Sequence, residues 1–157
     1  MRPLSFVLLA AATLFAIDLQ AMEPKIEPMP REYCYLAKPD VFETMTGWVH
    51  KIHGDELCVF ALPNKGQVKV PMVKVNGKLI SLRVAGATGA VSSKIRTSQS
   101  LARFESYDGN LKVEILSQVH NEVCRGQEDT ECFPPRSGEL SIQSVTGSAN
   151  ILVEQYQ

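Results

Sequence analysis

The stretch VPMVKVNGKLISLRV, residues 70–84, carries the strongest local signal for the fold of this chain. Asn76-Gly77 is the preferred dipeptide for a two-residue type I′ turn, because both turn positions require positive φ. Alternating apolar residues flank the turn on both sides, which is the pattern of a β-hairpin. This turn places Val73 opposite Ile80. We expect one apolar face made of Val73, Val75, Ile80, Leu82 and Val84.

A second hairpin is predicted from ARFESYDGNLKVEIL, residues 102–116, around Asp108-Gly109. The turn places Phe104 opposite Val113. The predicted buried face consists of Leu111, Val113 and Ile115, continued by Val119 and Val123.

Short apolar runs continue this pattern along the rest of the chain. Residues 43–61 form two runs around His53-Gly54-Asp55, and GELSIQS and ILVEQYQ form a last pair of strands joined by VTGSAN. Residues 85–100, rich in Gly, Ala, Ser and Thr, either cross between sheets or form a loop. Regularly spaced short strands predict an all-β protein, either an antiparallel β-sandwich or a partly open barrel of hairpin-connected strands.

The N-terminus predicts export. Residues 1–21, MRPLSFVLLAAATLFAIDLQA, combine one arginine, an apolar run and a short polar stretch ending in alanine, as in a secretory signal peptide. The apolar run is shorter than the roughly 20 residues of a membrane-spanning helix. Residues 22–32, which contain three prolines, predict an extended tether. A single all-β domain is then expected over residues 33–157.

The amino-acid composition argues against two classes of binding partner, nucleic acids and membranes. The formal net charge is −1, and 45% of residues are hydrophobic while 21% are charged. Nucleic-acid binding depends on clustered Lys and Arg, so this balance argues against it. The sequence also lacks the basic amphipathic helix of a protein bound to the membrane surface. We therefore expect a folded domain that binds neither nucleic acid nor membrane after cleavage of the signal peptide.

Four cysteines predict two disulfides. An even number in an exported chain favours disulfides over free thiols or a metal site. Four cysteines allow three connectivities, of which proximity in sequence favours Cys34–Cys58 and Cys124–Cys132. The sequence lacks the tight pairing of structural zinc ligands, so no metal or other cofactor is predicted.

VCRGQEDTECFPPRSG, residues 123–138, is the best candidate contact surface. A disulfide between Cys124 and Cys132 would close a small ring over acidic residues, and ring closure lowers the entropic cost of binding. The alternative is a stapled hairpin end with a solvated acidic tip. The candidate binding residues are Glu128, Asp129, Glu131, Phe133 and Arg136.

His50, His53 and Asp55 are the alternative candidate site. Residues three apart in a strand point to opposite faces, so both histidines could bind one metal ion only where the chain turns. Catalysis has less support, because no histidine or serine lies in a Gly-x-Ser-x-Gly or comparable motif.

The sequence thus predicts an exported, non-catalytic binding protein of the cell envelope or exterior. Its expected partner is another exported or envelope protein, and one form of such binding is inhibition. The second hypothesis is a small envelope enzyme or metal-binding protein centred on His50, His53 and Asp55. The third is a purely structural envelope component.

Overall fold

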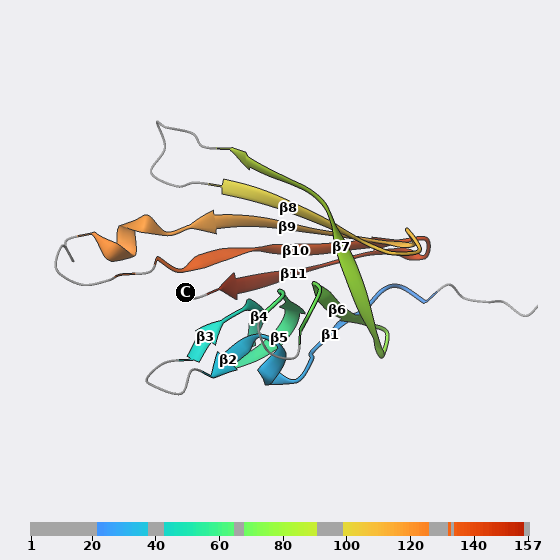
Figure 1. Cartoon of the computed structure of the whole chain (residues 1–157), viewed down its shortest axis with the longest axis horizontal. Coiled ribbons are helices and arrows are strands. Elements are labelled where there is room, and N and C mark those ends of the chain that lie inside the picture. Colours follow the sequence, from blue (N-terminus) through green and yellow to red (C-terminus); the bar gives the residue numbers. More distant parts are fainter. Residues whose placement is uncertain are drawn as a thin grey trace, which may run out of the picture.

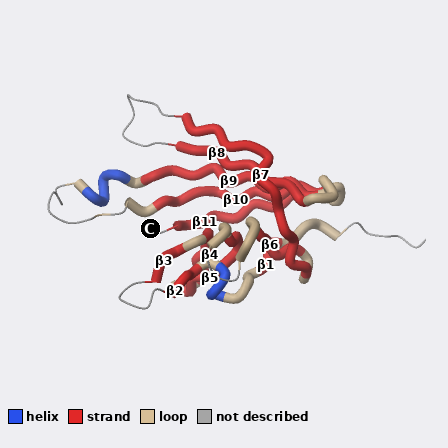
Figure 2. The backbone as a smooth tube through the Cα atoms, in the orientation of Figure 1, coloured by secondary structure: helices blue, strands red, loops and turns tan. Residues whose placement is uncertain are grey.

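The computed structural model describes residues 22–37, 43–64, 68–90, 99–125, 132 and 134–155. The described residues are almost entirely strands and turns, with two short 3-10 helices, η1 (Arg31–Tyr33) and η2 (Asn121–Cys124) (Figure 2). The signal peptide predicted over residues 1–21 lies outside the described residues.

The strands follow one another along the chain, mostly as hairpins (Figure 1). Their bounds are β1 Ile26–Glu27, β2 Tyr35–Ala37, β3 Glu43–Met45, β4 Gly47–Ile52, β5 Asp55–Ala61, β6 Met72–Val75, β7 Lys78–Ala90, β8 Gln99–Ser106, β9 Leu111–Val119, β10 Arg136–Ser144 and β11 Gly147–Gln155.

The main sheet closes on itself. In the described part of the chain its order is β1-β6-β5-β4-β11-β10-β9-β8-β7, and β6 also pairs with β7, so eight antiparallel strands make a closed barrel with β1 as an extra strand. Strands β2 and β3 form a separate two-stranded sheet. The prediction of an all-β, antiparallel, disulfide-bonded protein is confirmed. The sandwich alternative is wrong, because the β6–β7 pairing leaves one continuous sheet rather than two packed sheets, and the same pairing makes the barrel closed rather than partly open.

The two predicted hairpins have the expected registers. Val73 pairs with Ile80 and Phe104 with Val113. Asn76 and Gly77 both have positive φ, as a type I′ turn requires. The second turn differs, because only Gly109 has a positive φ and the connection spans Tyr107–Asn110.

Two residues assigned to the buried faces are exposed. Val84 is 65% exposed, because a register shift between Val84 and Gly86 distorts β7 there. Val123 is 55% exposed, because β9 ends at Val119 and the chain turns into η2. Residues 85–90 belong to β7 and residues 99–100 to β8, while 91–98 lie outside the described residues.

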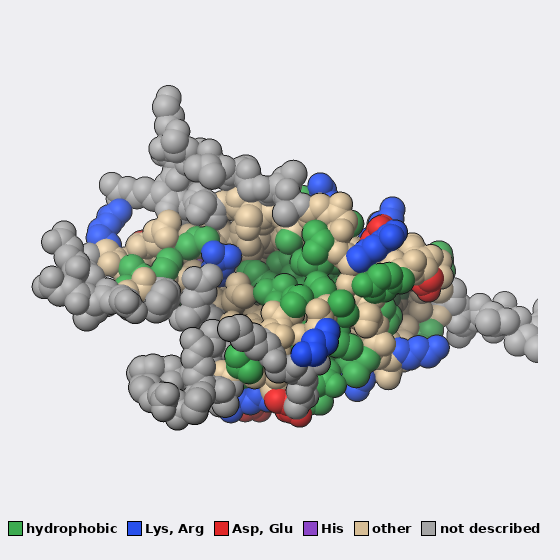
Figure 3. Space-filling view, viewed as in Figure 1, with side chains coloured by type: hydrophobic (Ala, Val, Ile, Leu, Met, Phe, Trp, Pro, Cys, Tyr) green, Lys and Arg blue, Asp and Glu red, His purple; other side chains and the backbone are tan. Residues whose placement is uncertain are grey.

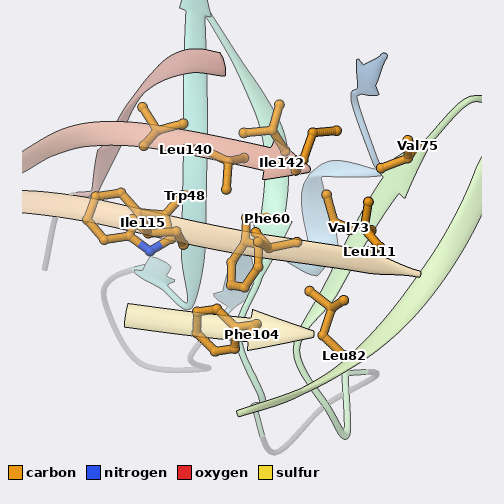
Figure 4. Close-up of a cluster of buried hydrophobic side chains, with 13 residues drawn as sticks. Trp48, Phe60, Val73, Val75, Leu82, Phe104, Leu111, Ile115, Leu140 and Ile142 are labelled. Carbon is orange, nitrogen blue, oxygen red and sulfur yellow. The ribbon is translucent and has the colours of Figure 1, made fainter. Parts of the chain in front are cut away.

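Alternate residues of every barrel strand fill the interior. Figure 4 shows Trp48, Phe60, Leu82, Phe104, Ile115, Leu140 and Ile142 converging from different strands. The Phe60 and Phe104 rings, from β5 and β8, meet with centroids 4.9 Å apart and planes tilted by 51°. An eight-stranded barrel has an interior just wide enough for side chains to fill. The barrel therefore has a packed core.

The pairing between β11 and β4 is short. Its strand register consists of a single pair, Glu154 with Val49. Side chains reinforce it, since His50 Nδ1 lies 2.6 Å from the Leu152 carbonyl oxygen and Lys51 Nζ lies 2.6 Å from Glu154 Oε2.

A second cluster packs outside the barrel against β4 and β5. Consecutive strand residues point to opposite faces, so Trp48 lies inward and Val49 outward, and the register shift beside them leaves Val59 of β5 without a partner residue on β4. The outer cluster consists of Met29, Cys34, Met45, Val49, Cys58, Ala61 and Val68. Cys34 is bonded to Cys58 within this cluster, one of the two pairings that proximity favoured.

The segment predicted as an extended tether, residues 22–32, is extended and pairs with the barrel. Ile26 and Glu27 pair with Val75 and Lys74 of β6. Met29 N–H donates to the Cys58 carbonyl at 2.7 Å. The three prolines keep this segment extended, and extended backbone can add to a sheet edge.

Replacing Phe60 by alanine should destabilise the protein by about 3–5 kcal/mol, because it leaves a cavity in the packed interior. The matched control, Val145→Ala, changes a side chain that is 85% exposed and should alter the free energy of unfolding by less than about 0.5 kcal/mol. Urea denaturation of both variants measures this, and equal midpoints would contradict a packed core.

The β8–β9 turn is organised by Asp108. Its carboxylate accepts hydrogen bonds from Ser106 Oγ at 2.5 Å and from Asn110 N–H at 3.1 Å and Nδ2 at 3.0 Å. These bonds, led by the Ser106 hydroxyl, hold the pKa of Asp108 below its ordinary value.

The lowered pKa of Asp108 in the folded protein predicts how the stability of the Asp108→Asn variant depends on pH. The carboxylate's contribution is present above the unfolded pKa of about 3.9 and is lost as pH falls through the lower folded pKa. The variant should therefore be less stable than wild type at pH 7, with the difference shrinking below about pH 4. Thermal melts from pH 7 to pH 2 measure it, and a pH-independent difference would contradict this assignment.

Candidate functional site

The predicted contact loop connects the C-terminal end of β9 to the N-terminal end of β10. These strands run away from the hairpin turns and carry η2 at their far end (Figure 1). Cys124 of η2 is bonded to Cys132. Glu128, Asp129, Glu131 and Phe133 lie outside the described residues, so their arrangement stays a prediction.

Arg136, the remaining candidate of that loop, is the first residue of β10. It pairs with Val119 on one side and Gln155 on the other, so it has the parity of the inward-facing residues. Its Nε is buried and makes no hydrogen bond within the described part of the chain. Arg136 therefore belongs to the inner side of this end of the barrel.

His50, His53 and Asp55 do not form one cluster. His50 contacts the Leu152 carbonyl across the β11–β4 pairing, whereas His53 lies in the β4–β5 turn with a φ of 51° and is exposed. Among the residues that the structure describes, no group of three or more His, Cys, Asp or Glu could hold a metal ion.

His120 connects η2 to β10 through both ring nitrogens. Its Nδ1 lies 3.0 Å from Glu122 Oε1 and its Nε2 lies 2.6 Å from Ser137 Oγ. Its backbone N–H donates to the Pro135 carbonyl at 3.0 Å, which fixes the ring at the end of the β9–β10 ladder. The carboxylate on Nδ1 favours the tautomer in which Nδ1 carries the proton and Nε2 accepts from the Ser137 hydroxyl.

The Glu122 carboxyl has a pKa below its ordinary value. The largest cause is a hydrogen bond from its own backbone N–H, and His120 and Arg125 add to the effect. Glu122 is therefore ionised at neutral pH and can hold the His120 ring.

The sheet register fixes what surrounds Ser137. Ser137 opposes Gln118 on β9 and Glu154 on β11, and these three residues share the outward parity. Glu154 is ion-paired with Lys51, whose Nζ lies 2.6 Å from its Oε2. The carboxylate beside Ser137 is therefore charge-compensated.

A row of leucines lies on the same outer face, two residues further along each strand. Leu101 of β8 opposes Leu116 of β9, Leu116 opposes Glu139 of β10, and Glu139 opposes Leu152 of β11. Leu116 is 48% exposed and Leu152 is 73% exposed. We call these four residues the leucine row. Isolated exposed leucines are ordinary, but here three leucines lie in one line across the sheet, interrupted only by Glu139.

The opposite end of the barrel has a shallow groove of about 800 Å³ between the hairpin turns. Exposed apolar side chains at this end are Met22, Leu79, Tyr107 and Val145. In Figure 3 hydrophobic side chains also gather at the centre of the visible face, with Lys and Arg side chains beside them. Met22 and Pro24 form part of the groove wall, so the N-terminal segment itself occupies some of this surface.

The sequence did not point to the leucine row or to Ser137. Period-two alternation places Leu116 and Leu152 on the polar parity of their strands, and this mismatch was the available signal for the row. The spacing His120-x-Glu122 was a local signal for the ring contact. Ser137 is 17 residues from His120 and is brought to it only by the β9–β10 pairing.

The chain matches no protein-family model, no curated protein and no solved structure. In the described ranges, no helix is long and apolar enough to cross a bilayer. The residues and their geometry therefore carry the functional inference.

Gly138 allows β9 and β10 to approach closely beside this surface. A Cβ at this position would lie 2.4 Å from the Leu116 carbonyl oxygen and 3.1 Å from Ser117 Cα, both backbone atoms. Gly138→Ala should therefore force the strands apart and destabilise the protein by about 1–3 kcal/mol. Urea denaturation and amide exchange along β9 measure it.

Gly86→Ala is the matched control, because a Cβ there meets nothing within 4 Å. It should change stability by less than about 0.5 kcal/mol. Equal effects of the two substitutions would contradict the close approach at Gly138.

Proposed function

We propose that the chain is an exported binding protein that contacts another exported or cell-envelope protein through the leucine row. The observation that carries this proposal is the line of outward-facing leucines on β8, β9 and β11, of which Leu116 and Leu152 are exposed and Leu101 is half-buried. Contiguous exposed apolar side chains are typical of protein contact sites. The packed interior favours a binding surface on the outside of the barrel, because the Phe60 and Phe104 rings fill its centre.

Export is part of the same proposal. Both disulfides are formed, and disulfides persist in oxidising compartments such as the periplasm or the exterior. The signal-peptide pattern of residues 1–21 points in the same direction.

The chemistry of the row indicates the chemistry of the partner. Glu139 stands between Leu116 and Leu152, so a complementary surface presents apolar side chains around one Lys or Arg. The Cys124–Cys132 loop adjoins this end of the sheet, and its residues Glu128, Asp129 and Glu131 add negative charge. An inhibitor-like contact with a basic partner is one form of this binding, and raised salt should weaken it.

The test is a crosslinking pull-down from native envelope and medium with residues 22–157 as bait. Leu116→Ser with Leu152→Ser should lower capture of a specific partner at least about tenfold, because each buried leucine contributes about 1.5–3 kcal/mol. The matched control bait is Val145→Ser, which removes an even more exposed apolar side chain at the opposite end and should capture as wild type does.

A third bait, with Glu128, Asp129 and Glu131 changed to serine and both cysteines kept, separates the loop from the row. Loss of capture with this bait as well would make the loop part of the contact. Equal capture by wild type and the double leucine variant, or capture by none of the baits, would remove the leucine row as the binding surface.

A further inference from the structure

Ser137, His120 and Glu122 have the arrangement of an activated serine nucleophile. Such a site requires a serine within hydrogen-bond reach of a base, and a third group that orients the base. The Ser137 Oγ to His120 Nε2 distance is 2.6 Å, and the His120 Nδ1 to Glu122 Oε1 distance is 3.0 Å. The Ser137 hydroxyl thus contacts one ring nitrogen of His120, and the Glu122 carboxylate contacts the other. This is the arrangement that His120 requires to abstract the serine proton.

The three residues are held by backbone structure rather than by chance contact of surface side chains. Ser137 sits in β10, which is paired on both sides, and the His120 backbone is bonded to Pro135. The η2 turn, closed by the Val123 N–H to His120 carbonyl bond of 3.2 Å, brings Glu122 back to the ring. The His120 side chain is 30% exposed and Ser137 is partly exposed, so a small molecule can reach the hydroxyl.

We propose that Ser137 is a nucleophile for acyl transfer from carboxylic esters, with His120 as its general base and Glu122 as the positioning residue. This inference does not rest on the proposed binding function. Gln118 opposes Ser137 in the β9–β10 register and shares its outward parity, so we assign its side-chain amide as the hydrogen-bond donor to the developing oxyanion.

The charges around Ser137 select the substrate class. Glu122 lies across the His120 ring from Ser137 and interacts electrostatically with Arg125, and Glu154, opposite Ser137 in the register, is paired with Lys51 Nζ at 2.6 Å. Both carboxylates are therefore charge-compensated, so the site takes neutral esters.

The reaction balances with water as the second reactant. Ser137 Oγ forms a bond to the carbonyl carbon while its proton passes to His120 Nε2. The carbon–oxygen bond to the alcohol then breaks, and the alcohol leaves with that proton. Water, deprotonated by His120, attacks the acyl-serine, which releases the carboxylic acid and returns the proton to Ser137.

The test uses a neutral, biotin-linked fluorophosphonate on residues 22–157 with both disulfides intact. Ser137 Oγ attacks phosphorus, the phosphorus–fluorine bond breaks, and fluoride leaves while His120 takes the proton. Peptide mapping by mass spectrometry of the wild-type protein should place the adduct on Ser137. This mapping needs no variant, so it holds even if a substitution disturbs folding.

Variants then assign the roles. His120→Ala should lower the labelling rate about 100-fold or more, as expected for loss of a general base, and added imidazole should restore part of it. Glu122→Gln should lower the rate about tenfold and Glu122→Asp should lower it less, because the aspartate keeps the charge. The matched control is Ser141→Ala, on the same face of β10, which should label as wild type does.

If His120 only fastens η2 to β10, the results differ. Ser137 would then label no faster than Ser141, and His120→Ala would lower the melting temperature without changing the labelling rate. Either result overturns the proposal, whatever the pull-down shows. Adduct formation at Ser137 that depends on His120 supports it.

Discussion

The contact between the Phe60 and Phe104 rings across the barrel determines which surfaces of the molecule are accessible. The two rings come from opposite walls and their centroids are 4.9 Å apart, so side chains rather than a lumen occupy the centre. A barrel of eight strands reaches this condition by geometry, because its interior is only wide enough for one layer of side chains from each wall. Recognition and chemistry in the described part of this protein consequently belong to the outside of the sheet.

Closure of the sheet has a second consequence, which concerns the edges. A free strand edge offers unpaired N–H and C=O groups to other chains. Here β6 pairs with both β5 and β7, and the short β11–β4 pairing is reinforced by the His50 and Lys51 contacts. His50 therefore contributes to the barrel wall, although its spacing from His53 suggested a metal ligand. With the barrel edges closed, the side chains of the outer face make up most of the exposed surface of the described barrel strands.

Two kinds of surface meet at the far end of β9 and β10. The leucine row is apolar with one central carboxylate, whereas the adjacent outward row holds Gln118, Ser137 and Glu154. The register of the sheet makes them neighbours, since rows of the same parity are two residues apart along each strand. The disulfide between Cys124 and Cys132 closes the loop that follows, which holds the η2 end of this surface together.

The sequence by itself determined how neighbouring strands pair, but it did not determine that the sheet closes into a barrel. Asn76-Gly77 dictated the β6–β7 register, because only a turn with two positive φ values joins the strands there. Short separations favoured both disulfide pairings that the structure contains. Alternation identified the all-β class, but it describes one strand at a time, so it could not distinguish a sandwich from a barrel.

Tertiary structure decided everything that depends on long-range pairing. Closure through β11 and β4 joins residues about a hundred positions apart, and the same pairing network turns the N-terminal segment from a tether into a strand. The contact of Ser137 with His120 arises because β9 and β10 align across the cysteine loop. Local propensity acts through neighbouring residues, whereas these contacts arise only when strands distant in the chain share one closed sheet.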